Sequence, residues 1–296
     1  MKNEFIKKDV SVATMEQTSK VLVPEKLIPL EKAVTYYNNF YHTRIAIDAS
    51  DQTRAVWFNF EQLENYFNRV YTICSEKSIE ITRFSFVLGA SASGERTVFI
   101  APSTYDEGFD LHRAFSFDNG ALSFIHRFPG ENYSSITNFE NKHSLEESLL
   151  LAPTGLISTA DAITLYNNYY TFKTGPFTPI MPFDTRFIHY EKGEFEGFIS
   201  YLKYHKDDIT GVNAIFGAKD DIPSEGLYAN HTTLFFSPTH ENTKMKSLSC
   251  LDNLDCNVLD ISKEIWSLDE FESNQPEVIS LFNIGSGAPP PPHHGD

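Results

Sequence analysis

The spacing of apolar residues near the start of the chain predicts a helix, a strand and a second helix. Residues 33–41 carry apolar side chains at close to helical spacing and follow Pro29, which favours a first helical turn. Residues 53–58 are β-branched and aromatic, as is typical of a strand. Asn59 and Gln62 then have the spacing of a helix N-cap. The apolar stripe that follows consists of Phe60, Leu63, Tyr66, Phe67, Val70 and Cys74.

Two strands are predicted next. Alternation over residues 82–88 indicates a half-buried strand that ends at Gly89. Residues 98–101 are continuously apolar and stand before Pro102, so we expect a short and more deeply buried strand.

A hairpin should complete this unit. Residues 114–117 and 122–125 flank Asp118-Asn119-Gly120, whose Asn and Gly tolerate the positive φ angles of tight hairpins. The order is therefore helix, strand, helix, strand, strand, hairpin, which predicts an α+β fold with antiparallel or mixed sheets and helices on one face.

The same pattern returns in the second half. Residues 33–41 align with residues 162–170, with six of nine positions identical. Three further blocks follow in the same order: 53–58 with 185–190, 84–89 with 212–217, and 97–103 with 233–239. The sequence thus predicts two tandem copies of one unit.

The predicted organisation has four parts. Residues 1–28 form an N-terminal arm, residues 29–152 the first unit, and residues 157–275 the second unit. Residues 276–296, with prolines at 289–292, form a mobile tail.

These blocks resemble a family of small uncharacterised bacterial proteins that are usually one unit long. The resemblance implies a doubled α+β fold and carries no activity. It rests on Thr53-Arg54, Trp57-Phe58, Leu63, Tyr66, the strands that end at Gly89 and Gly217, and the run Thr233 to Thr239.

The net charge and the cysteine content indicate which kinds of partner and which cellular compartment to expect. With 40 acidic and 24 basic residues, the net charge of −16 predicts no binding to nucleic acid or to anionic membranes. The first 20 residues lack the apolar stretch of a secretory signal, and three cysteines fit a reducing compartment, so we expect a cytoplasmic protein. Cys250 and Cys256 flank a predicted turn, and we expect both to be free thiols.

Motifs for cofactors and metals are missing from the sequence, so no cofactor and no metal site is predicted. The segment 89–94 resembles a nucleophile elbow, but Ser93 stands where that motif needs Gly, which favours a plain loop. His112 and His126 would lie across the hairpin, yet no third ligand accompanies them.

Two matched arginines, Arg54 and Arg186, are the first candidates for ligand binding, since a guanidinium can hold a carboxylate or phosphate with two hydrogen bonds. Structural pairs with Asp51, with Asp184 or with a carboxylate on a helix are the alternative.

Further candidates are the Tyr-Asn patches and one asymmetric pair. The patches display amides and hydroxyls, although the asparagines equally suit helix C-caps. His189 stands where the first copy has Trp57. These candidates are Tyr37, Asn38, Trp57, Tyr166, Asn167 and His189.

Two functions therefore remain open. The first is a non-catalytic binding or scaffolding protein that engages another protein through the surface between the units or through the proline tail. The second is an enzyme with a site between the halves, where Arg54 or Arg186 orients a small anionic substrate and His189 acts as acid and base.

Overall fold

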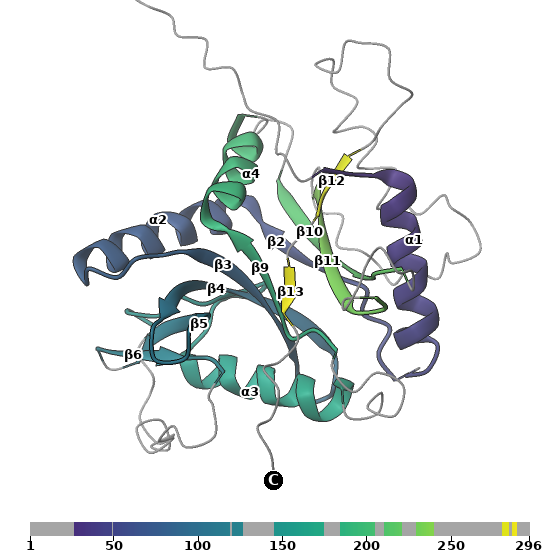
Figure 1. Ribbon diagram of the computed structural model, residues 1–296, viewed down its shortest axis with the longest axis horizontal. Helices are drawn as coiled ribbons and strands as arrows, with labels where there is room; N and C mark the ends of the chain where they lie inside the picture. Colours follow the sequence, from purple (N-terminus) through teal and green to yellow (C-terminus); the bar gives the residue numbers. More distant parts are fainter. Residues whose placement is uncertain are drawn as a thin grey trace, which may run out of the picture.

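The computed structural model describes residues 27–48, 50–118, 120–126, 145–174, 184–204, 210–220, 229–239, 280–283 and 286–288. It combines helices with antiparallel sheets, so the α+β prediction is confirmed (Figure 1). The helices are α1 (Leu30–Phe40), α2 (Phe60–Glu76), α3 (Thr159–Tyr169) and α4 (Lys192–Tyr204). A π-helical turn follows α1 and another follows α3; these are η1 (Tyr41–Ile45) and η3 (Tyr170–Thr174).

The strands form two sheets whose neighbouring strands are antiparallel. The first sheet has the order β1 (Leu27–Pro29), β12 (Ser280–Asn283), β11 (Thr232–Thr239), β10 (Gly211–Ala218), β2 (Ala55–Asn59). The second sheet has the order β13 (Ser286–Ala288), β9 (Phe187–Glu191), β3 (Arg83–Ala90), β4 (Arg96–Asp106), β5 (Leu111–Asp118), β6 (Ala121–Phe124). The short strand β7 (Leu151–Ala152) pairs with β4 and with β8 (Gly155–Leu156).

Both sheets draw strands from both halves of the chain. Strand β2 pairs with β10, with Ala55 opposite Ile215, and β9 pairs with β3, with Phe187 opposite Val87. The helices follow the same exchange, because α1 packs against β10 and α3 against β3 (Figure 1). The first helix and first strand of each half therefore belong to the sheet built from the other half.

Two glycines permit the close contact between these helices and strands. A Cβ atom placed on Gly217 would lie 3.1 Å from Cβ of Tyr36 in α1. One placed on Gly89 would lie 3.1 Å from Cβ of Leu165 in α3. The glycines that end two of the predicted strands thus serve to seat a helix on each sheet.

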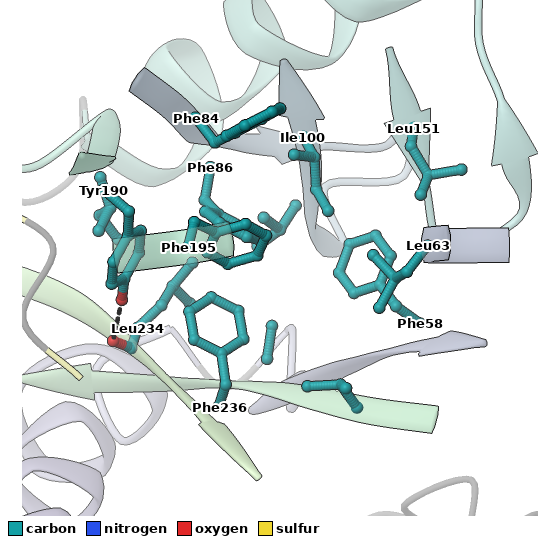
Figure 2. Close-up of a cluster of buried hydrophobic side chains, with 14 of the residues drawn as sticks. Phe58, Leu63, Phe84, Phe86, Ile100, Leu151, Tyr190, Phe195, Leu234 and Phe236 are labelled. Carbon is teal, nitrogen blue, oxygen red and sulfur yellow. Dashed lines mark hydrogen bonds between the residues drawn. The ribbon is translucent and has the colours of Figure 1, made fainter. Parts of the chain in front are cut away.

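Aromatic side chains fill the space between the two sheets (Figure 2). The centroid of the Phe86 ring in β3 lies 4.6 Å from the ring centroid of Phe236 in β11 and 5.2 Å from that of Phe195 in α4. Helix α2 adds the predicted stripe from Phe60 to Cys74, all of it buried, and its N-cap Asn59 accepts a hydrogen bond from the Gln62 amide. The helix and cap predictions for this segment are confirmed.

The placement of helices differs from the expectation of one covered face. Phe84 and Phe86 of β3 face α2 and α4, whereas Val87 belongs to the cluster packed under α3. Both faces of β3 are covered, so this strand is buried along nearly its whole length and not half-buried as predicted. Strand β4 is also longer than predicted, and it continues through Pro102, which lies opposite Phe84.

The hairpin between β5 and β6 lies where the sequence places it, with Gly120 at φ +79°. Strand β1 comes partly from the predicted arm, and β12 and β13 come from the predicted tail, so these parts of both segments are paired in the sheets. Cys250, Cys256 and the proline run lie outside the described residues.

If the exchanged strands hold the halves together, cutting the chain between them should not separate the pieces. We expect the full chain, cleaved at a protease site inserted between residues 126 and 145, to elute as one particle in native size-exclusion chromatography. Each fragment supplies strands to both sheets. The fragments should separate in urea, and separate elution without urea would contradict the arrangement.

Removal of the Phe86 ring should destabilise the fold strongly. Phe86→Ala leaves a cavity among three aromatic rings, and we expect a loss of about 3–5 kcal/mol in the free energy of unfolding. Leu122→Ala in β6, where the side chain is 37% exposed, is the control and should cost less than about 1 kcal/mol. Urea unfolding measures both.

Candidate anion-binding sites

Arg54 lies just before β2 and is 5% exposed. Its Nη1 atom donates a hydrogen bond to the hydroxyl of Tyr37 in α1 at 3.2 Å. The guanidinium also lies over the ring of Tyr41, the first residue of η1, at 4.6 Å from the ring centre. The helix and the π-helical turn after it thus place two tyrosines on one buried arginine.

Arg186 has the same surroundings at the start of β9. It is 6% exposed, and its Nη1 atom donates to the hydroxyl of Tyr166 in α3 at 3.1 Å. The ring of Tyr170, the first residue of η3, lies 4.0 Å from the guanidinium. Nδ1 of His126 is 2.9 Å from the Tyr166 hydroxyl. The Arg54 cluster (Arg54, Tyr37, Tyr41) and the Arg186 cluster (Arg186, Tyr166, Tyr170) therefore match at aligned positions.

The carboxylates expected to pair with these arginines are engaged elsewhere. Asp51 binds Nη1 of Arg96 at 2.7 Å and Nζ of Lys173 at 3.1 Å. Asp184 lies 3.3 Å from Nη2 of Arg44. The structural alternative, in which Arg54 pairs with Asp51 or Arg186 with Asp184, is wrong, and no carboxylate among the described residues forms an ion pair with either arginine.

In both Arg54 and Arg186 the Nε atom is buried and has no hydrogen-bond partner among the described residues. The bonds to the tyrosine hydroxyls use Nη1, on the opposite side of each guanidinium from Nε. The side that carries Nε and Nη2 is the one that binds a carboxylate or phosphate oxygen pair. A buried cation without an anion is costly, so this arrangement favours an anionic ligand.

Asp51 and Asp184 do not pair with Arg54 or Arg186, and other groups keep both carboxylates ionised. Burial alone would raise the pKa of Asp184, but Arg44 and hydrogen bonds from Thr232 and Thr185 outweigh it and lower that pKa. For Asp51, burial is likewise outweighed, by hydrogen bonds from Thr53 and by the charges of Arg96 and Lys173, and the pKa falls below its ordinary value.

His189 does not join the Arg186 cluster. Its Nδ1 lies 2.7 Å from the Ser85 hydroxyl, and its ring stacks on Phe187 at 5.9 Å. The Phe187 ring in turn packs on Tyr166 at 5.2 Å. Burial, with Arg83 and His112, lowers the pKa of His189 to about 4, so the ring is neutral at pH 7. The contacts of His189 are thus with Ser85 and Phe187, and those of Arg186 are with Tyr166 and Tyr170.

The remaining candidates, Trp57, Asn38 and Asn167, lie within a strand or a helix. Trp57 lies opposite Asn213 in the first sheet, and its indole covers Gly211, where an added Cβ would come within 2.3 Å. Asn38 and Asn167 lie within α1 and α3, and each helix continues into a π-helical turn, so neither asparagine is a C-cap.

The segment 91–95 and His112 make local contacts. Residues 91–95 form the turn between β3 and β4, where Gly94 donates to the Ser91 carbonyl, as the loop interpretation predicts. His112 contacts Thr82. Within the described ranges no group of three or more His, Cys, Asp or Glu side chains could hold a metal ion.

A pocket of about 250 Å³ lies where residues of both halves meet. Its lining includes the ion pair between Lys173 and Asp48, with Nζ 2.6 Å from Oδ2, and the exposed side chains of Ile47 and Phe172. Because Lys173 directly follows Phe172 in η3, this pocket adjoins the turn that carries Tyr170.

Comparison of the chain with protein-family models, curated proteins and solved structures finds no match. The resemblance to small bacterial proteins therefore stays a prediction. Among the helices that the structure describes, none is both long and apolar enough to cross a membrane.

Sequence reasoning missed two pairs of residues: one pair belongs to the clusters, and the other binds the aspartates that precede the arginines. Tyr41 and Tyr170 end the best aligned block, and Arg44 and Lys173 are basic residues three positions later in each half. Extending the alignment by three residues would have found the basic pair, but only the fold shows that each crosses to the other half.

Acid should weaken the fold through the buried aspartates. The folded-state pKa of Asp184 is lowered. Its contribution to the free energy of unfolding is therefore fully present above the unfolded-state pKa of about 3.9, and it is lost as the pH falls through the folded-state pKa. We expect Asp184→Asn, which removes the carboxylate 3.3 Å from the buried guanidinium of Arg44, to lose about 3–5 kcal/mol at pH 7 and to unfold with a shallower dependence on pH below 4.

Glu64→Gln is the control, since Glu64 forms an exposed ion pair with Lys203. It should change stability by less than about 1 kcal/mol. Urea unfolding between pH 3 and pH 7 gives both results, and equal losses in the two variants would refute the role of the buried pair.

Proposed function

We propose that this protein is a non-catalytic binding protein whose ligand carries a carboxylate or phosphate group held by Arg54 and Arg186. The observation that carries the proposal is the buried Nε of both arginines, which lacks a partner in each case. Each arginine is at least nine-tenths buried, and no carboxylate of the described residues neutralises it. A guanidinium in such a place is costly to the fold unless an anion binds it.

The protein's other charges support a specific site over general attraction. With a net charge of −16, the chain repels anions at long range, so a bound anion must be recognised by geometry. Tyr37 and Tyr166 fix one side of each guanidinium by accepting a hydrogen bond from Nη1. The planar group is then oriented with its other side available for a pair of oxygen atoms.

We also infer that the two halves are copies of one unit that are interlocked by exchange of their first helix and strand. The support comes from contacts at aligned positions. Phe216 donates its amide to the Arg54 carbonyl, and Leu88 donates its amide to the Arg186 carbonyl. Two copies of one unit would explain why the arginine clusters occur twice. Engagement of a partner protein through the proline tail concerns residues outside those described.

An unpaired buried arginine predicts an unusual mutational result. In buffer without phosphate or carboxylates, Arg186→Met should keep or raise the free energy of unfolding, because it removes an unneutralised buried charge while preserving volume. Arg96→Met is the matched control, because it removes the partner of Asp51 and should cost about 3–5 kcal/mol.

The second half of the test adds ligand. Inorganic phosphate or succinate, at constant ionic strength, should raise the melting temperature of the native protein and have less effect on Arg54→Met and Arg186→Met. Arg83→Met, at a half-buried arginine that pairs with Glu191, should respond as the native protein does. Equal responses in all variants, or a large loss of stability in Arg186→Met without ligand, would mean that these arginines are structural.

A further inference from the structure

Each π-helical turn carries two side chains with different contacts: one lies over the arginine of one cluster, and the other binds an aspartate that precedes the arginine of the other cluster. In η1, Tyr41 covers Arg54, while Arg44 crosses to Asp184, two residues before Arg186. In η3, Tyr170 covers Arg186, while Lys173 crosses to Asp51, three residues before Arg54. The turn that covers one arginine therefore also holds the segment that leads into the other.

Ligand entry at either arginine has to disturb one of these turns. Nε of Arg186 is buried, and Tyr170 is the exposed side chain that lies over the guanidinium, with 45% of its surface accessible. Displacement of Tyr170 moves the turn that contains Lys173. Lys173 is 3% exposed and lies against both Asp48 and Asp51, so it cannot shift without altering the contacts of Asp51.

The two turns are suited to alternate between two arrangements. A π-helical turn contains one more residue per hydrogen-bonded ring than an α-helix, and such turns in helices occur frequently at functional sites. In η1 this bond runs from the Ala46 amide to the Tyr41 carbonyl at 2.8 Å. A change of that register moves the tyrosine and the basic residue together, so a single rearrangement affects both clusters.

We propose that the Arg54 and Arg186 clusters bind anions with positive cooperativity, transmitted through Tyr170 and Lys173 of η3 and through Tyr41 and Arg44 of η1. This inference rests on the proposed function. The first anion disturbs the crossed ion pairs, and the second then binds to a cluster whose neighbouring contacts are already loosened. Because coupling free energies are reciprocal, an anion at either site must strengthen binding at the other by the same factor.

The experiment follows each site separately in the full chain. The ¹⁵Nε–Hε signals of Arg54 and Arg186, assigned with Arg54→Lys and Arg186→Lys, are recorded during titration with inorganic phosphate at constant ionic strength. We expect the affinity of the more weakly binding site to fall about five-fold or more when the other arginine is replaced by Met, and the affinity of the tighter site to fall by less. Arg83→Met, at a position outside both clusters, should leave both affinities unchanged.

Tyr170→Ala tests the path and leaves every ion pair intact. This side chain is partly exposed, so the variant should fold, and the Arg186 site should bind phosphate more tightly because its cover is gone. Phosphate at Arg186 should then alter the affinity at Arg54 less than it does in the native protein. Unchanged coupling in this variant would overturn the path through η3.

The remaining outcomes separate the two proposals. If both arginines bind phosphate with affinities that ignore the state of the other, the sites are independent and cooperativity is refuted while the binding function stands. If neither signal responds to phosphate or to succinate, both the binding function and the coupling are refuted. A response of the same size at Arg83 would also overturn them, since it would mean general association of anions with arginines.

Discussion

The pairing of β2 with β10 and of β9 with β3 is the constraint on which the rest of the structure depends. Each pairing takes the first strand of one half into the sheet of the other, and the helix before that strand goes with it. The core between the sheets can form only after both exchanges, because Phe86 from one half packs against Phe236 from the other. Stability and the placement of the arginines therefore depend on the same contacts between halves.

The exchange also explains why so many charged groups are buried. The segments before β2 and β9 must pass from a helix of one half into the sheet of the other, and they carry Asp51 and Asp184 with them. Each aspartate meets a basic residue from the opposite half, Lys173 or Arg44, as well as donors at the start of β4 or β11. Arg44, Arg96 and Lys173 each lie in an ion pair with a carboxylate, whereas Arg54 and Arg186 form none with the described residues.

Much of the local structure could be predicted from the sequence, whereas the connections between elements could not. The stripe from Phe60 to Cys74 and its Asn59 cap follow from spacing and capping chemistry alone. The burial of β3 on both faces does not, because Ser85 reads as a solvent-facing residue until Ser103 and His189 are found beside it. For the same reason the sequence could align Arg54 with Arg186 and yet assign them the wrong partners, since Lys173 and Arg44 reach the aspartates from the other half.

Tyrosine at the two covering positions suits a site that must open. A guanidinium that lies over an aromatic ring gains an electrostatic attraction that needs no counter-ion, which lowers the cost of keeping the charge buried. That attraction is weaker than an ion pair to a carboxylate, so an incoming anion can replace it, whereas it could not displace Asp51 from Arg96 at 2.7 Å. The buried arginines of this fold thus differ in their partners: Arg96 forms an ion pair with an aspartate of the chain, and Arg54 and Arg186 are held by tyrosines, the weaker contact that the proposed anion binding requires.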